Sequence, residues 1–243
     1  GMLKSASFEN MSGGGGGKAI SFMISQKPKG TIMVNSTPIV IRSITNHKGF
    51  KKAGGGVLSY KDVTPIAGII GDYGAIVVAK DSKFKNFKDV VAAYKKDPKS
   101  VKMSGGSVRD AGGKAMAGLL SGEVSLMSTG LGEVVGAQDQ VRILGITAPN
   151  RLKDAPNVPT LKEQGYDVTF VNWRGFFGPP GMSSKDKNAV AKLLGDVQKT
   201  KEWEAVRKRN AWVNIYNPGA KFDRFLADQT KVMTSLMKKL GVL

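Results

Sequence analysis

Short apolar runs that alternate with segments of helical periodicity constrain the fold of this chain most strongly. Apolar residues recur at intervals of three and four from Phe84 to Tyr94, from Val190 to Val197 and from Phe222 to Leu240, which predicts amphipathic helices. Strands that alternate with helices favour parallel sheets covered by helices, so we predict an α/β fold. The runs with the length and composition of buried strands are 31–34, 75–79, 124–127, 141–147 and 168–171.

The composition excludes several classes of protein. Cysteine is absent and His47 is the only histidine, which excludes disulfides, thiolate chemistry and multi-histidine metal sites. No apolar run reaches the roughly 18 residues of a membrane-spanning helix, so we expect a soluble protein. The 243 residues are compatible with one large domain or with two lobes.

The balance of charge favours an anionic partner. Lysine and arginine number 37 against 19 aspartates and glutamates, which gives a formal net charge of +18. A nucleic acid is one such partner, but the lysines are spread over the chain, the aromatic content is 7%, and no motif combines basic with stacking aromatic residues. We therefore prefer a small anion and keep nucleic-acid binding as the less favoured alternative.

The glycine run 13–17 does not form a nucleotide-binding motif. A phosphate loop requires glycine where the chain has Ser12, and serine or threonine where it has Ala19. A dinucleotide fingerprint through Gly14 and Gly16 lacks the acidic residue about 20 positions later. We therefore predict no cofactor.

Catalytic signatures are also missing. His47 lies in the polar, glycine-rich stretch 45–56, which we interpret as a mobile surface loop with a solvated histidine. A G-x-S-x-G nucleophile elbow is absent. We predict neither a catalytic residue nor a metal site.

Three clusters of small polar residues follow predicted strands. A strand that ends in small residues exposes backbone N–H groups and hydroxyls, and a following helix adds its positive end. Each cluster is compatible with an ordinary strand-to-helix turn, but α/β sheets bind ligands at the carboxyl ends of their strands. Three clusters together therefore favour an anion-binding site. They are Asn35-Ser36-Thr37, the segment 103–110 with Ser104 and Gly105, and Ser128-Thr129-Gly130.

Several longer segments resemble the substrate receptors of tripartite tricarboxylate transporters. The most specific is the succession of RILGITAPNR at 142–151, VPTLKEQGY at 158–166 and NWRGFFGPPG at 172–181. Shorter matches are DVTPIA at 62–67, SGGS at 104–107, LLSGEV at 119–124 and STGLGE at 128–133. Glu9-Asn10 and the glycines after it resemble the family's Glu-Asn and glycine-rich turn. The resemblance extends from about Phe8 to the C-terminus.

The resemblance implies a fold and a function. The family has a two-lobe, type II periplasmic-binding-protein-like fold, binds a di- or tricarboxylate in a cleft between the lobes and delivers it to membrane permease subunits. It is extracytoplasmic, either in a periplasm or lipid-anchored on the outer face of the cell membrane. An enzyme acting on a carboxylate is the alternative, but no acid–base pair or metal cluster supports it. The ligand-binding residues carried over are Asn35, Ser36, Thr37, Ser104, Gly105, Ser107, Asp110, Ser128, Thr129 and Gly130.

The resemblance also predicts the lobe boundaries. We expect lobe 1 at 1–75 and 173–243 and lobe 2 at 76–172, with Trp173 assigned to the core in preference to the cleft. The family's opening strand and first carboxylate-binding loop have no counterpart before Ser5, and a further helix and strand have none between Asp110 and Ala111. Residues omitted from the sequence are one explanation and a damaged paralogue of the family is another. We favour the first, because a sheet without its opening strand exposes unpaired backbone.

Overall fold

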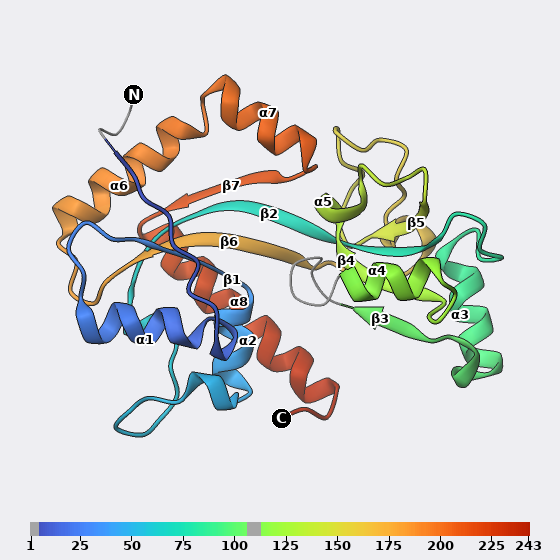
Figure 1. The fold of residues 1–243 in the computed structure, drawn as a ribbon, viewed down its shortest axis with the longest axis horizontal. Coiled ribbons are helices and arrows are strands. Elements are labelled where there is room, and N and C mark those ends of the chain that lie inside the picture. The colour runs from blue at the N-terminus through green and yellow to red at the C-terminus, as the bar shows by residue number, and fades with distance from the viewer. Residues whose placement is uncertain (1–4, 106–112) are drawn as a thin grey trace. The chain divides into compact units, whose positions relative to one another are not determined.

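The computed structural model describes residues 5–105 and 113–243 (Figure 1). The chain divides into two compact units. Unit 1 consists of Gly1–Ile70, Trp173–Thr200 and Asn214–Leu243, and unit 2 consists of Gly71–Asn172 and Lys201–Val213. The predicted lobes differ from these units chiefly at Lys201–Val213, which the sequence analysis assigned to lobe 1. Both units combine strands with helices, so the predicted α/β class is confirmed.

Unit 1 contains a sheet to which distant parts of the chain contribute. Strand β1 pairs antiparallel with β6, from Met33 opposite Phe177 to Ser36 opposite Arg174. Strands β6 and β7 each pair with β2. The strands are β1 (Met33–Ser36), β2 (Thr64–Ala79), β6 (Val171–Gly178) and β7 (Val213–Pro218). The helices are η1 (Gly14–Gly16), α1 (Gly17–Gln26), α2 (Pro38–Ile44), η2 (Lys48–Phe50), η3 (Tyr60–Asp62), α6 (Ser184–Val197) and α8 (Ala220–Lys239).

The centre of unit 1 is an aromatic cluster between β6 and α8. Trp173, Phe177 and Phe222 are fully buried, which confirms the assignment of Trp173 to the core. The rings of Trp173 and Phe222 meet edge to face with their centroids 5.8 Å apart, a preferred arrangement of aromatic pairs. Gly175 lies directly beneath Phe222, where a β-carbon would overlap the ring. The sheet therefore needs glycine there to let α8 pack closely.

Unit 2 is a second sheet with apolar clusters on both faces. Strands β3 and β4 are parallel, and the second half of β2 pairs antiparallel with β4 and β5. Neighbouring residues Leu126 and Met127 belong to different buried clusters, as expected when side chains alternate between two covered faces. The strands are β3 (Met103–Gly105), β4 (Leu126–Gly130) and β5 (Val141–Ile146). The helices are α3 (Phe87–Lys96), η4 (Pro98–Ser100), α4 (Gly113–Leu120), α5 (Leu131–Val134), η6 (Lys162–Gln164) and α7 (Lys201–Arg209).

The structure corrects three predictions. The prediction of a strand at 168–171 is wrong except at Val171, because Phe170 instead bonds Thr147 through its N–H at 3.1 Å and its carbonyl at 2.6 Å. The expectation of parallel pairing fails for β2, whose second half pairs antiparallel with both β4 and β5, so that only β3 and β4 are parallel neighbours among the pairs described in unit 2. The surface-loop prediction is wrong at Phe50, which is fully buried in η2.

Helix α7 is tied to the rest of unit 2 by Arg207. Its guanidinium bonds Glu204 at 2.7 Å, Asp154 at 2.7 Å and the carbonyl of Trp212 at 2.6 Å. The hydrogen bond from Arg207 is the main cause that lowers the pKa of Glu204 from 4.5 to about 2. A depressed pKa in the folded state means that ionised Glu204 stabilises the fold above pH 4.5 and that this contribution is lost as pH falls through 2.

We expect the Arg207→Gln variant to lose part of this acid sensitivity. Without the guanidinium, the pKa of Glu204 returns toward 4.5, so less of the free energy of unfolding depends on pH between 4.5 and 2. Urea unfolding at a series of pH values measures this slope, and Glu204→Gln should reduce it in the same way. An unchanged slope in both variants would show that the pair does not stabilise the fold.

Candidate functional site

The first predicted cluster lies in unit 1, where β1 passes into α2. Asn35 and Ser36 end the strand, and the side-chain oxygen of Asn35 accepts a 2.8 Å hydrogen bond from the Ser36 amide. Thr37 is buried, and its carbonyl accepts bonds from the amides of Val40 and Ile41 at 3.1 and 3.2 Å. Pro38 opens the helix, a favourable position because the first helical amide has no intrahelical partner.

A glycine turn packs against this cluster. Gly13 to Gly16 all have positive φ, between 55° and 134°, a region that favours glycine. A β-carbon at Gly16 would lie 3.5 Å from the side-chain nitrogen of Asn35, and one at Gly15 would overlap the guanidinium of Arg42. The turn therefore brings backbone amides, Asn35 and a cation together. The glycine turn and Asn35 were predicted from the sequence. Arg42 was not, because it lies inside α2 and no local motif connects it with the turn.

The glycine turn packs against η2. Gly14 and Gly17 both lie against the carbonyl of Gly49, so closely that a β-carbon at Gly17 would overlap that oxygen. His47 caps η2 by accepting a 3.1 Å hydrogen bond from the Gly49 amide through Nδ1. His47 is therefore half-buried and has a structural contact, rather than being fully solvated as predicted.

The other two predicted clusters come together in unit 2. Strands β3 and β4 run parallel with Ser104 beside Met127 and Gly105 beside Ser128, so their carboxyl ends lie next to each other. Side chains alternate along strands, which puts Ser104 and Thr129 on one face and Ser128 on the other. The hydroxyl of Ser104 is buried and has no hydrogen-bond partner among the residues that the structure describes. Ser107 and Asp110 lie outside the described residues.

Two carboxylates of the chain reach the same strand ends. The hydroxyl of Thr129 donates to Glu133, and the amide of Gly132 donates to Asp72 at 3.2 Å. Asp72 is buried, and Gly130 leaves room for its carboxylate. Burial also raises the pKa of the neighbouring Tyr73 phenol, which keeps it protonated. Donors expected for a ligand are thus partly used by internal acids, and no local sequence motif indicated this.

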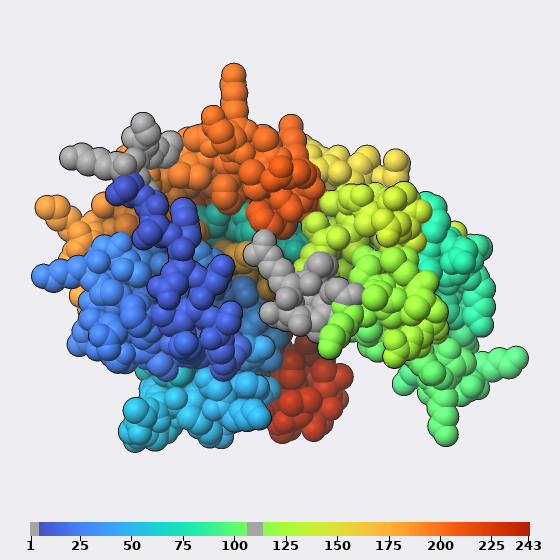
Figure 2. All heavy atoms as spheres, viewed as in Figure 1, coloured from blue at the N-terminus to red at the C-terminus, as the bar shows by residue number. Residues whose placement is uncertain are grey.

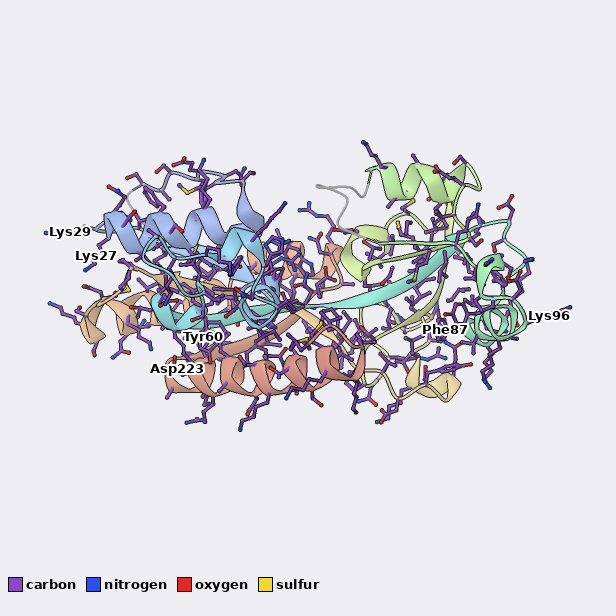
Figure 3. All side chains as sticks on the ribbon, turned by 90° about the horizontal axis from the view of Figure 1, so that it is seen from below. Lys27, Lys29, Tyr60, Phe87, Lys96 and Asp223 are labelled. Carbon is purple, nitrogen blue, oxygen red and sulfur yellow. The ribbon has the colours of Figure 1, made fainter. Side chains whose placement is uncertain are left out.

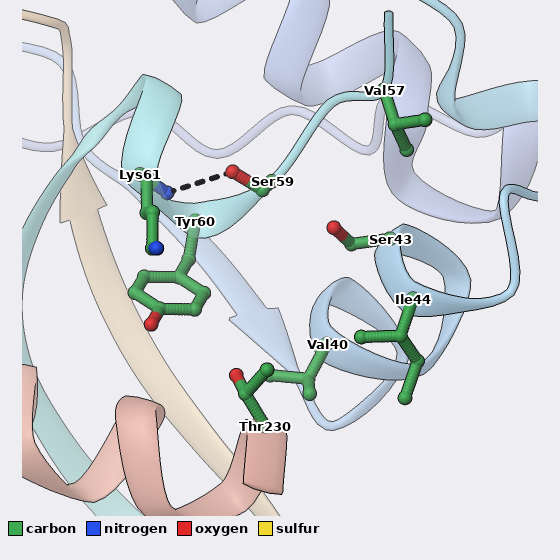
Figure 4. A pocket seen from close by; sticks show the side chains of 8 residues that line it. All are labelled: Val40, Ser43, Ile44, Val57, Ser59, Tyr60, Lys61 and Thr230. Carbon is green, nitrogen blue, oxygen red and sulfur yellow. Dashed lines mark hydrogen bonds between the residues drawn. The ribbon is translucent and has the colours of Figure 1, made fainter. Parts of the chain in front are cut away.

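A pocket of about 240 Å³ lies elsewhere in unit 1, between the end of α2, η3 and α8 (Figure 4). The hydroxyl of Ser59 accepts a 3.2 Å hydrogen bond from the Lys61 amide at its rim. None of the described residues that form it belongs to the predicted clusters, because Thr37 is at the opposite end of α2. The lining residues are Val40, Ser43, Ile44, Val57, Ser59, Tyr60, Lys61 and Thr230.

The described parts of the chain contain neither a metal-binding cluster nor a membrane-spanning helix. No group of three or more histidine, cysteine, aspartate or glutamate side chains within residues 5–105 and 113–243 is arranged to hold a metal ion. Within the same ranges, no helix has both the length and the apolar character needed to span a bilayer.

Several solved structures share the fold of this chain. A periplasmic binding protein, BugD, has a TM-score of 0.78 at 18% identity, covering 96% of this chain and 86% of its own. MatC from Rhodopseudomonas palustris with bound malate has a TM-score of 0.77 at 16% identity, covering 93% and 85%. Rpa4515 from R. palustris with adipate has a TM-score of 0.79 at 16% identity, covering 96% and 85%. The fold is therefore that of periplasmic binding proteins.

The family follows from the sequence itself. Residues 108–242, more than half of the chain, match the family described as "Tripartite tricarboxylate transporter family receptor". The chain belongs to this family, and the resemblance drawn from its motifs is confirmed. No curated protein matches the sequence.

Proposed function

We propose that this protein is an extracytoplasmic receptor that binds a small di- or tricarboxylate and delivers it to a membrane permease. Membership of the tricarboxylate-receptor family carries the proposal. The malate bound to MatC and the adipate bound to Rpa4515 are dicarboxylates on similar folds, which supports the same ligand class here. The net charge of +18 attracts such anions at long range.

Fixed dipoles bind the carboxylate oxygens in this proposal. In unit 1 the donors are the backbone and hydroxyls of Asn35, Ser36 and Thr37, supported by the glycine turn. In unit 2 they are Ser104, Gly105 and Ser128, with Ser107, Thr129, Gly130 and Asp110 as further members of the proposed site. A ligand held by both units favours the closed arrangement of the two lobes, which the permease then recognises.

Asp72 and Glu133 limit which anions fit the unit 2 side. Their carboxylates already accept from Gly132 and Thr129, and like charges nearby disfavour a second ionised carboxylate. We therefore expect the ligand to contact unit 2 mainly through Ser104, whose hydroxyl has no hydrogen-bond partner among the described residues, and through Gly105. An enzymatic role is the less favoured alternative, because the family that the chain matches is one of transporter receptors.

We expect one carboxylate to raise the melting temperature strongly in a screen of malate, adipate, succinate, citrate, isocitrate, tricarballylate and glutamate. Duplex DNA serves as the competing class of ligand. Flat responses to all the acids, with stabilisation by DNA instead, would overturn the proposal. Turnover of the stabilising acid would favour the enzyme alternative.

The Ser104→Ala variant should bind that carboxylate about 10- to 150-fold more weakly, because a hydrogen bond to a charged group is worth about 1.5–3 kcal/mol. Its melting temperature without ligand should not fall, since the Ser104 hydroxyl has no internal partner among the described residues. Ser121→Ala is the matched control, because the Ser121 hydroxyl donates to the carbonyl of Gly118 at the end of α4. Isothermal titration calorimetry measures all three affinities, and equal values for wild type and Ser104→Ala would remove Ser104 from the site.

A further inference from the structure

The two units carry nearly equal numbers of basic residues, but unit 1 has the larger net positive charge because it has fewer acidic residues. This unit has 19 lysines and arginines against 6 aspartates and glutamates, whereas unit 2 has 18 against 13. Several of the unit 1 lysines extend into solvent, as Lys27 and Lys29 do beyond the end of α1 (Figure 3). The larger net positive charge of unit 1 strengthens its attraction to negatively charged partners.

The C-terminal half of α8 combines this charge with exposed apolar side chains. Val232, Leu236 and Leu240 recur at intervals of four and so share one side of the helix, which we call the α8 stripe. Together with Val242 and Leu243 they are between 40% and 64% exposed. The end of α8 lies at the surface of the molecule in Figure 2. The stripe continues the side of α8 on which Phe222, Leu226 and Met233 pack into unit 1, because Leu236 and Leu240 follow Met233 by three and seven positions.

Lysines flank the α8 stripe without acidic neighbours on the same segment. Lys231, Lys238 and Lys239 are exposed, and the sequence has no aspartate or glutamate between Asp228 and Leu243. Lys239 follows Leu236 by three positions and therefore lies beside the stripe. An exposed apolar side edged by lysine is typical of helices that lie in a membrane interface.

We propose that the α8 stripe binds the surface of an anionic lipid membrane, with its aliphatic side chains at the acyl boundary and its lysines near the phosphates. The residue types favour lipid over protein, because the centres of protein interfaces are enriched in aromatic residues and arginine and depleted in lysine. The α8 stripe itself is aliphatic, and the charged residues between Asp228 and Leu243 are lysines. This surface keeps the protein at a membrane whether or not ligand is bound, so it is independent of the carboxylate site.

Vesicle co-sedimentation tests this proposal. The full chain should sediment with vesicles that contain phosphatidylglycerol and remain in solution with pure phosphatidylcholine. The Leu236→Ser, Leu240→Ser variant and the Lys238→Glu, Lys239→Glu variant should each bind the anionic vesicles at least about tenfold more weakly. High salt should weaken wild-type binding as well, because it screens the lysines.

Two matched controls lie in unit 2. Leu120→Ser removes a leucine that is 45% exposed at the end of α4, and Lys95→Glu, Lys96→Glu reverses the lysine pair in the last turn of α3. Both controls should bind anionic vesicles like the wild type. Melting temperatures verify that all variants fold, and an unchanged response of the α8 variants to the stabilising carboxylate separates this proposal from the proposed function.

Four outcomes would overturn the proposal. The wild type could fail to bind phosphatidylglycerol vesicles, or it could bind phosphatidylcholine equally. The controls could weaken binding as much as the α8 variants, which would indicate attraction by net charge alone. Finally, analytical ultracentrifugation could reveal a dimer that only the Leu236→Ser, Leu240→Ser variant loses, and the stripe would then be a contact between two copies of the chain.

Discussion

Replacing Phe222 by alanine is expected to lower the free energy of unfolding by about 3–5 kcal/mol. The ring is fully buried, and its centroid lies 5.8 Å from that of Trp173 and 5.4 Å from that of Phe177. Its removal leaves a cavity between β6 and α8 that the surrounding backbone cannot close. Urea unfolding followed by tryptophan fluorescence measures the loss, since Trp173 is a direct neighbour of the missing ring.

Two comparisons make this result specific. Phe8→Ala removes a phenylalanine that is 96% exposed and should change stability by less than about 0.5 kcal/mol. Gly175→Ala should destabilise the wild type by about 1–3 kcal/mol, because the new methyl group overlaps Phe222. It should cost less in the Phe222→Ala background, where the ring is absent. Strictly additive losses would contradict this account of the packing between β6 and α8.

The Gly17→Ala variant should lose about 3 kcal/mol of stability and also bind carboxylate more weakly. Gly17 has ordinary helical dihedral angles, so the cost arises from overlap of the methyl group with the carbonyl of Gly49. That carbonyl belongs to the backbone and cannot rotate away as a side chain would. The displaced glycine turn would shift relative to Asn35, which is the proposed effect on binding.

Gly54→Ala is the matched control for this substitution. Gly54 lies in the stretch 45–56 together with Gly49, has no positive φ, and a β-carbon there would have no neighbour within 4 Å. Thermal unfolding and calorimetry on both variants should therefore show loss of stability and affinity for Gly17→Ala alone. Equal stability of the two variants would mean that the glycine turn and η2 are not interlocked.

Local patterns predicted three of the helices, α3, α6 and α8. The apolar spacing around Val90, Val190 and Phe222 corresponds to α3, α6 and α8, because each helix buries one side against its own unit. The first half of β2 was not predicted, since Gly68, Gly71 and Gly74 interrupt it and resemble turn residues. Two of these glycines make room for distant side chains, Gly68 for Phe222 and Gly74 for Thr147. Such a reason cannot be read from neighbouring residues in the sequence.

The candidate site was predictable to the same extent. The sequence placed Ser104 and Ser128 near the carboxyl ends of two predicted strands. Strands β3 and β4 are parallel neighbours, so these two ends lie next to each other. The contribution of Asp72 was not predictable, because it lies 60 residues from Gly132, whose amide donates a hydrogen bond to its carboxylate. Whether the predicted residues bind a ligand stays a prediction.

The path of the chain through the two units has a practical consequence for dividing the gene. The backbone passes between units at residues 70–71, 172–173, 200–201 and 213–214, and β2 contributes to both. A fragment limited to 71–172 would lack α7 and with it the partner that Arg207 provides for Asp154. Dividing the chain at one position therefore does not give two fragments that each contain a whole unit. A chimaera that takes one unit from another receptor needs all segments of that unit to be replaced together.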